Sequence, residues 1–263
     1  MYRGFNLKLD DYSLFDNYIP KISKDYYFQD IWDEVQDNLD DFLDSTNSLD
    51  GTAIQDYWFP KIEADIFISH SHRDEDLAIY LACWLEDTFD LKVFIDSQVW
   101  GYGDNLIKEL YDEYGADNIK EYNQITSHVH MMLSTALTRM IDKCEAIFFL
   151  NTPNSINADD IIDKTYSPWI YHEIAVTQMI RKRKLRKDNN GELKPIQENV
   201  NLKYKVSLEH LYSLDKKNLI KWRKEKEEGG FYASNNCKYR HSLDCLYENF
   251  PLKRISNYQN LYG

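Results

Sequence analysis

The chain has 263 residues, enough for one large domain or for a domain of about 150 residues with extensions. Its net charge of −13 disfavours nucleic acid and anionic membranes as partners, and no apolar run reaches the roughly 18 residues of a membrane span. Because the N-terminus lacks an apolar signal core and the four cysteines (Cys83, Cys144, Cys237 and Cys245) form no C-x-x-C pair, we expect a cytoplasmic protein with free thiols.

The first 60 residues are acidic and rich in aromatic side chains. The stretch from Ile31 to Asp50 carries seven acids and no base, and Ile31, Val35, Leu39 and Leu43 recur every four residues. This spacing predicts an amphipathic helix with a solvated acidic face. We therefore expect residues 1–60 to form a helical N-terminal extension.

From residue 61 onward, short apolar runs alternate with segments of helical spacing. The runs "ADIFISHS", "LKVFID" and "EAIFFLN" predict three buried strands, and "NLKYKVSL" predicts a fourth. Helices are expected over residues 74–89, 127–144, 167–184 and 215–225. Strands that alternate with helices indicate a parallel sheet covered by helices on both faces. The predicted fold is an α/β domain over 61–226 with an insertion near 108–126, followed by a helical C-terminal extension over 227–263.

Ligands of such sheets bind at the carboxyl ends of the strands. The loops 69–76, 96–105 and 151–169 should therefore meet at one edge of the sheet. In the third loop, Ser167 is a suitable helix N-cap and Pro168 suits the first helical position, which puts Trp169 and Glu173 on one helix face. The local pattern alone leaves two alternatives for Glu173: a group at this edge, or a solvated carboxylate on the opposite side of the helix from Ile170 and Ile174.

Four segments in order resemble a Toll/interleukin-1 receptor (TIR) domain. They are "IFISHSHRDED", "VFIDSQVWGYGDNL" with Gly103 as the glycine of the BB loop, "ALTRMIDKCEAIFFLNTPNS", and "SPWIYHEI" with the family's S-x-W-x-x-x-E pattern. The resemblance covers roughly residues 63–183. It implies a flavodoxin-like, three-layer parallel sheet and an enzyme that cleaves NAD⁺, with Glu173 as the catalytic residue.

The chemistry of that reaction is compatible with a single carboxylate. The nicotinamide ring of NAD⁺ is already a cationic leaving group, so no general acid is needed, and its departure builds oxocarbenium character on the ribose. A fixed carboxylate stabilises that charge. The resemblance assigns substrate contacts to the three loops and the strands before them; the expected residues are Phe67, Ser69, His70, Arg73, Trp100, Gly103 and Trp169.

The resemblance also implies partners. NAD⁺ is the expected substrate and no further cofactor is implied. Self-association through the BB loop, residues 96–105, is expected, and so is a separate effector that senses a linear or cyclic ADP-ribose product, as in Thoeris-like antiphage defence systems.

Several alternatives stay open. A TIR domain can be a non-catalytic scaffold that binds other TIR domains, and a nucleoside hydrolase or transferase would ignore NAD⁺. A hydride-transfer role is disfavoured because "GYG" lacks the third glycine of a dinucleotide fingerprint. We predict no metal site: His70 and His72 have no second ligand pair, and Cys237, His241 and Cys245 lack a fourth ligand.

Overall fold

The structure is a computed structural model of the 263-residue chain. It describes residues 3–9, 12–15, 42–43, 49–99, 103–114, 119–156, 164–165, 167–180, 204–205, 207–230 and 241–251. The chain divides into two compact units, residues 1–215 and 216–263, which are described separately. This boundary lies ahead of the one expected after residue 226. The helix predicted over 127–144 lies within a longer helix, and helices are present within the ranges predicted as 74–89, 167–184 and 215–225.

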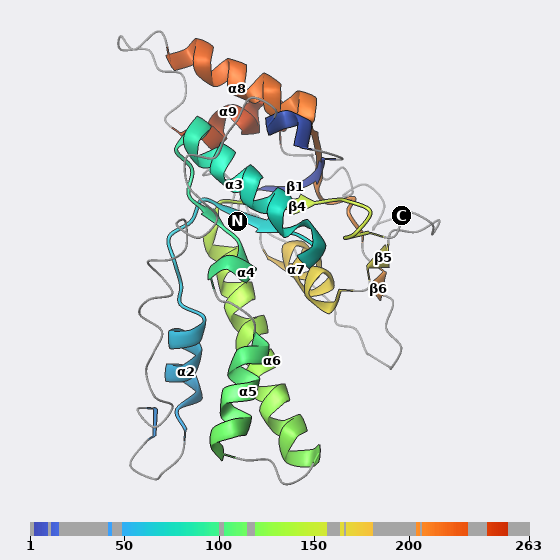
Figure 1. The fold of residues 1–263 in the computed structure, drawn as a ribbon. Helices are drawn as coiled ribbons and strands as arrows, with labels where there is room; N and C mark the ends of the chain where they lie inside the picture. The colour runs from blue at the N-terminus through green and yellow to red at the C-terminus, as the bar shows by residue number, and fades with distance from the viewer. Residues whose placement is uncertain are drawn as a thin grey trace, which may run out of the picture. The chain divides into compact units, whose positions relative to one another are not determined.

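The first unit is an α/β domain built on a five-stranded, all-parallel sheet (Figure 1). The strand order is β3-β2-β4-β1-β7. The strands are β1 (Arg3–Lys8), β2 (Ile66–Ser69), β3 (Val93–Phe94), β4 (Ala146–Leu150) and β7 (Tyr212–Asp215). Every residue of β2, β3 and β4 is buried, as expected for strands that are covered on both faces.

Two predictions for the sheet are wrong. Residues 3–8 do not belong to a helical extension, because β1 pairs with β4 on one side and with β7 on the other. Among its described residues, the predicted fourth strand contributes β6 (Tyr204–Lys205), which pairs antiparallel with β5 (Lys164–Thr165) outside the main sheet. The edge strand is β7 instead, where buried and exposed residues alternate. Both errors concern short strands whose place depends on pairing with distant segments.

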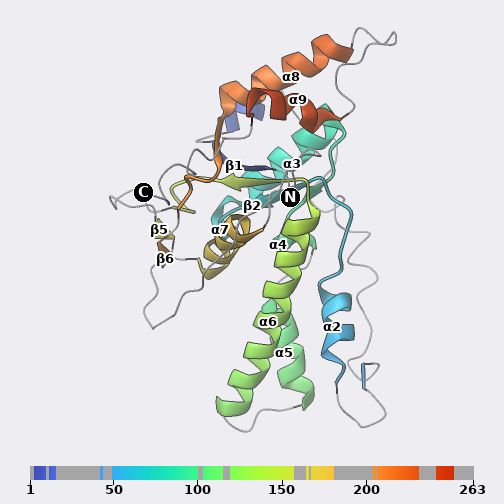
Figure 2. The same cartoon turned by 180° about the vertical axis from the view of Figure 1, so that it is seen from behind.

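Helices cover both faces of this sheet (Figures 1 and 2). One face carries α3 (Glu75–Phe89), and the other carries α5 (Gly103–Tyr114), α6 (Ile119–Lys143) and α7 (Pro168–Met179). On the second face, Phe67, Phe94 and Ile147 from the sheet pack in one apolar cluster with side chains of α5, α6 and α7. Shorter elements are η1 (Tyr12–Phe15), η3 (His72–Asp74) and α4 (Asp96–Val99).

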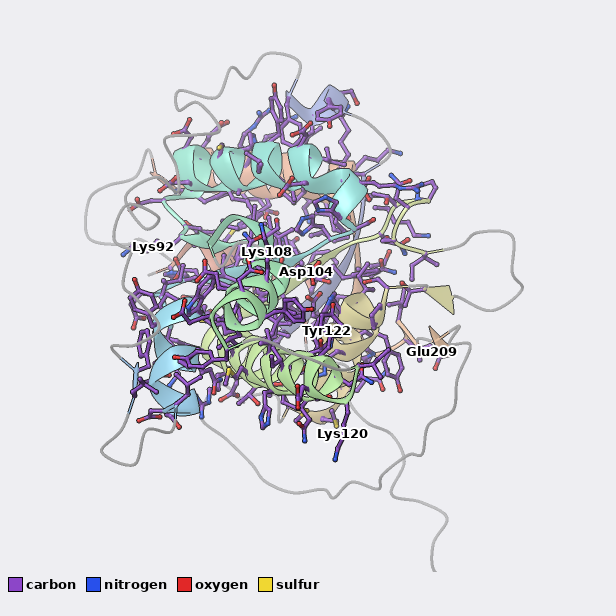
Figure 3. The ribbon with its side chains drawn as sticks, turned by 60° about the horizontal axis from the view of Figure 1, so that its bottom comes forward. Lys92, Asp104, Lys108, Lys120, Tyr122 and Glu209 are labelled. Atoms are coloured by element: carbon purple, nitrogen blue, oxygen red, sulfur yellow. The ribbon has the colours of Figure 1, made fainter. Side chains whose placement is uncertain are left out.

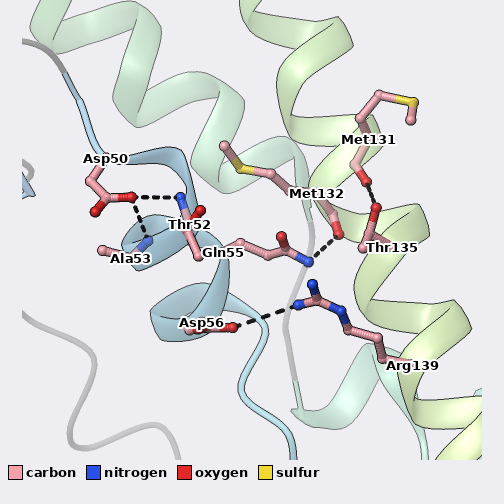
Figure 4. Close-up of polar contacts among 9 residues, drawn as sticks. All are labelled: Asp50, Thr52, Ala53, Gln55, Asp56, Met131, Met132, Thr135 and Arg139. Carbon is pink, nitrogen blue, oxygen red and sulfur yellow. Dashed lines mark hydrogen bonds and ion pairs between the residues drawn. The ribbon is translucent and has the colours of Figure 1, made fainter.

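The predicted insertion near 108–126 is largely helical, since α5 and α6 together form an antiparallel pair that extends away from the sheet (Figure 2). Helix α2 (Gly51–Trp58) packs beside α6 (Figure 4). Asp50 caps α2 by accepting hydrogen bonds from the backbone N–H groups of Thr52 (2.9 Å) and Ala53 (3.1 Å). Gln55 then donates to the carbonyl of Met132 at 3.2 Å. The amphipathic helix predicted at 31–43 lies almost wholly outside the described residues.

The second unit contains α8 (Lys216–Gly230) and α9 (Ser242–Asn249). The indole N–H of Trp222 donates to the carbonyl of Ser242 at 3.0 Å, and Asn249 donates to Glu225 at 2.6 Å. Within the ranges that the structure describes, no helix is long and apolar enough to cross a membrane.

Candidate functional site

A pocket of about 420 Å³ opens at the carboxyl ends of β2 and β3. The carboxyl ends of the strands are the usual ligand site of an open α/β sheet, and the strand order reverses beside this pocket, between β2 and β4. Its lining comes from the ends of β2 and β3 and from the helices α4 to α7. The described lining residues are His70, His72, Asp96, Ser97, Gly103, Asp104, His130, Leu133, Ser167, Trp169 and Glu173.

Helix α7 delivers Glu173 to this pocket. The helix begins as predicted: Ser167 accepts a hydrogen bond from the N–H of Ile170 at 3.2 Å, and Pro168 is the first helical residue. Both Trp169 and Glu173 line the pocket, as their spacing of four residues indicates. Glu173 is only 3% exposed, so the solvated alternative is wrong. Ile170 and Ile174 are buried too, because α7 is covered on more than one side.

The Glu173 carboxylate is held by Ser69, the last residue of β2. The Ser69 hydroxyl donates a hydrogen bond to Oε2 of Glu173, and both side chains are buried. Burial raises the pKa of Glu173 well above its usual value, the negative charge of Asp96 raises it further, and the Ser69 hydrogen bond partly opposes both. The surroundings of the carboxyl group therefore favour its protonated form, and a cation placed beside it would favour the ionised form.

His70 follows Ser69 in the chain and joins a different wall of the pocket. Its Nε2 lies 3.5 Å from the hydroxyl of Ser97, which belongs to α4 after β3. His70 is 9% exposed, and its buried Nδ1 has no hydrogen-bond partner in the described part of the chain. The two residues at the end of β2 thus contact two separate elements, Ser69 with α7 and His70 with α4.

An aromatic pair forms the side of the pocket towards α6. The rings of Trp169 and His130 meet edge to face, with centroids 5.5 Å apart. Leu133 lies one turn further along α6. Gly103 begins α5 opposite these residues, and a Cβ atom there would come within 3.4 Å of Leu133. This wall presents an indole ring and apolar carbon to a ligand.

Hydrogen bonds join the first and third predicted loops. Asp74 is buried and accepts hydrogen bonds from the Thr152 hydroxyl at 2.5 Å and from the Asn154 amide at 2.7 Å. These bonds connect the segment after β2 to the segment after β4. They fix the backbone that carries His70 and His72.

The structure brings together five of the eight predicted site residues. Glu173, His70, Gly103 and Trp169 line the pocket, and Ser69 is bonded to Glu173. Phe67 does not line it: its ring is fully buried, 5.3 Å from the ring of Phe94 in the apolar core. Arg73 is exposed on η3 and is also absent from the lining. Trp100 lies outside the described residues.

The sequence analysis placed His72, Asp96, Ser97 and Asp104 in loops expected at this edge, but it assigned neither these residues nor His130 to the substrate site. Asp96 carried a usable signal, since it stands directly after a buried strand at the edge where ligands bind. The helix pattern alone could not assign His130 to the pocket, because its place depends on how α6 packs against α7. No group of three His, Cys, Asp or Glu side chains within the described ranges is arranged to hold a metal ion.

Comparison of the chain with models of protein families, with curated proteins and with solved structures gave no match.

Proposed function

We propose that this chain is a TIR-type enzyme that cleaves NAD⁺ between nicotinamide and ribose, with Glu173 as the catalytic residue. One observation carries the proposal: a carboxylate that is 3% exposed lies in a pocket at the strand ends and pairs with no Lys or Arg among the described residues. Burying such a group is costly when its charge is not compensated. Ionisable groups with shifted pKa values in clefts are candidates for chemistry.

The strand order supports the TIR assignment. Within the segment that resembles a TIR domain, β2, β3 and β4 are the first, second and third strands in the chain. Their order in the sheet, β3-β2-β4, is therefore 2-1-3, as in the flavodoxin-like order. Here the fourth position is filled by β1 from the N-terminus.

In the proposed reaction the glycosidic C–N bond breaks and its electron pair leaves with nicotinamide, which becomes neutral. The positive charge moves to the ribose as an oxocarbenium ion. Ionised Glu173 stabilises this charge through an electrostatic contact that strengthens as the bond breaks. The Ser69 hydroxyl holds Oε2 of Glu173 by a hydrogen bond. No described group is hydrogen-bonded to Oε1 of Glu173, so Oε1 can face the sugar. The indole of Trp169 supplies a stacking surface for the departing ring.

Two acceptors complete the reaction. Water adds to the oxocarbenium ion and releases a proton, which gives linear ADP-ribose. A nucleophilic atom of the same molecule gives a cyclic isomer, and this route is favoured where the bound substrate and the aromatic wall exclude water. A cyclic product would suit a signal that a separate effector protein detects.

The test is nicotinamide release by the wild type and by Glu173→Gln, with mass spectrometry of the sugar product. Gln keeps the size of the side chain and can still accept the Ser69 hydrogen bond, but it has no charge. We expect kcat to fall about 10²–10³-fold with little change in KM, as for the loss of one transition-state contact. Both linear and cyclic ADP-ribose are expected from the wild type.

Glu113→Gln is the matched control, because it removes an exposed carboxylate from α5 outside the pocket lining. Circular dichroism confirms that the variants are folded. Equal nonzero rates in wild type and Glu173→Gln would show that Glu173 is not catalytic. Absence of nicotinamide release at any protein concentration would leave the non-catalytic TIR scaffold as the better assignment.

A further inference from the structure

The pocket has charged side chains of one sign only. Its described lining contains the carboxylates of Asp96, Asp104 and Glu173, and it contains no Lys or Arg. The remaining polar groups there are imidazoles and hydroxyls. At neutral pH the pocket therefore carries uncompensated negative charge whenever these carboxyl groups are ionised.

Neither aspartate has a compensating partner in the described part of the chain. Asp96 and Asp104 form no ion pair or hydrogen bond there, and Asp96 acts instead on Glu173 through its charge. Lys108 lies one helical turn beyond Asp104 on α5 (Figure 3), but it does not line the pocket and no ion pair joins the two. The field of these carboxylates therefore acts on whatever enters the pocket.

A second, independent feature indicates a ligand. His70 is nine-tenths buried in the pocket wall, and its Nδ1 lacks a hydrogen-bond partner among the described residues. Buried polar atoms are normally bonded, so an unbonded one next to a cavity suggests that a bound molecule completes the site. Trp169 adds an indole, the side chain that binds cations most strongly through its face.

We infer that Asp96 and Asp104 are specificity-determining residues that make this pocket select a planar cationic ring, an N-alkylated pyridinium, over a neutral ring of the same shape. The inference rests on the proposed function, in which that ring is the nicotinamide of NAD⁺. It adds that charge, rather than shape alone, orients the substrate.

The volume of the pocket supports an orientation in which the nicotinamide end of the substrate enters it. Its volume of about 420 Å³ is near the lower end for small-molecule sites, which span roughly 300–1,000 Å³. It therefore accepts a ring with its sugar rather than a whole dinucleotide. The same carboxylates repel the pyrophosphate, so the dinucleotide enters with its cationic end first. The reduced form, whose ring is neutral, loses the attraction.

The test measures binding and does not require turnover. Isothermal titration compares 1-methylnicotinamide, a cation, with neutral nicotinamide at low and high salt. The proteins are the wild type, Asp96→Asn, Asp104→Asn and the double variant, with circular dichroism to confirm folding. Asp112→Asn is the matched control, because it removes an exposed carboxylate from the same helix, α5, outside the pocket lining.

We expect the wild type to bind the cation at least about tenfold more tightly than nicotinamide, with a preference that weakens in salt. Asp104 is exposed, and its replacement should reduce the preference about two- to fivefold. Asp96 is half-buried, and its replacement should reduce the preference about tenfold. Neither substitution, nor the control, should alter the affinity for nicotinamide.

Equal binding of the two rings by the wild type, or a preference that survives in the double variant, would overturn the inference. These outcomes are separate from those of the proposed function. A charge preference without nicotinamide release would reject NAD⁺ cleavage and keep the cation site. Cleavage of NAD⁺ without any charge preference would reject the cation site alone.

Discussion

At the scale of single residues, the surroundings of Glu173 have opposing effects on the ionised form of its carboxyl group. Ser69 donates a hydrogen bond to it, while burial and the charge of Asp96 both raise its pKa. The folded state therefore binds a proton at Glu173 more tightly than the unfolded state does. As the pH rises through the raised pKa of the folded state, the free energy of unfolding falls and the protein becomes less stable. Below the pKa of the unfolded state the group is protonated in both states, and this penalty is absent.

Glu173→Gln should therefore change stability in a pH-dependent way. The neutral amide has no charge to bury, so the variant should be more stable than the wild type at alkaline pH, on the order of 1–3 kcal/mol. The difference should shrink towards zero in acid. Urea unfolding over a series of pH values measures it, with Glu113→Gln as the exposed control. A difference that does not vary with pH would show that the carboxyl group of Glu173 has the same pKa in the folded and unfolded states.

At the scale of elements, the N-terminal strand β1 is part of the core. It lies between β4 and β7, and its residues Phe5 and Leu7 are fully buried. Phe5 packs edge to face on Phe148, with ring centroids 5.3 Å apart. Gly4 permits a close approach, since a Cβ atom there would lie 2.5 Å from the side chain of Leu211. The sheet on which the pocket stands thus depends on a strand from the far end of the sequence.

Replacing Leu7 by Ala should destabilise the protein by about 2–5 kcal/mol, because it leaves a cavity in the sheet core. Lys8 is exposed on the same strand, and Lys8→Ala should change the unfolding free energy by no more than about 0.5 kcal/mol. Denaturant unfolding of both variants measures the contrast. Similar small effects in the two would place β1 outside the cooperative core.

At the scale of the whole molecule, we propose that the segment 96–105 also contacts a second copy of the chain. Its two ends, Asp96–Ser97 and Gly103–Asp104, line the pocket, and Trp100 falls between them in the sequence. An apolar aromatic residue in such a loop is a typical interface anchor.

We therefore expect specific activity to rise with protein concentration, and Trp100→Ala to lower it several-fold at a given concentration. Nicotinamide release over a dilution series measures this effect, and light scattering follows the association. Tyr111→Ala, which removes an exposed aromatic from α5, serves as the control. A rate that is strictly proportional to enzyme and unaffected by Trp100→Ala would indicate a self-contained monomeric site.

The sequence by itself determined the elements whose signals are local. Three apolar runs predicted β2, β3 and β4, and Ser167 with Pro168 predicted the start of α7 and the shared face of Trp169 and Glu173. It also predicted the edge of the sheet at which the pocket lies, because parallel strands end together. These features follow from periodicity, capping and the geometry of parallel sheets.

Only the tertiary structure decided the rest. The burial of Glu173 depends on what covers α7, and the helix sequence is compatible with either face being buried. The place of β1 depends on pairing with β4, which lies far along the chain, and a short strand carries little sign of its partner. Phe67 was expected at the substrate but lies in the core, because it shares a face of β2 with Ser69 yet stands two residues before the carboxyl end of the strand, where side chains of the sheet and of the helices cover it. Contacts between distant segments are set by packing, and a pattern confined to one segment cannot specify them.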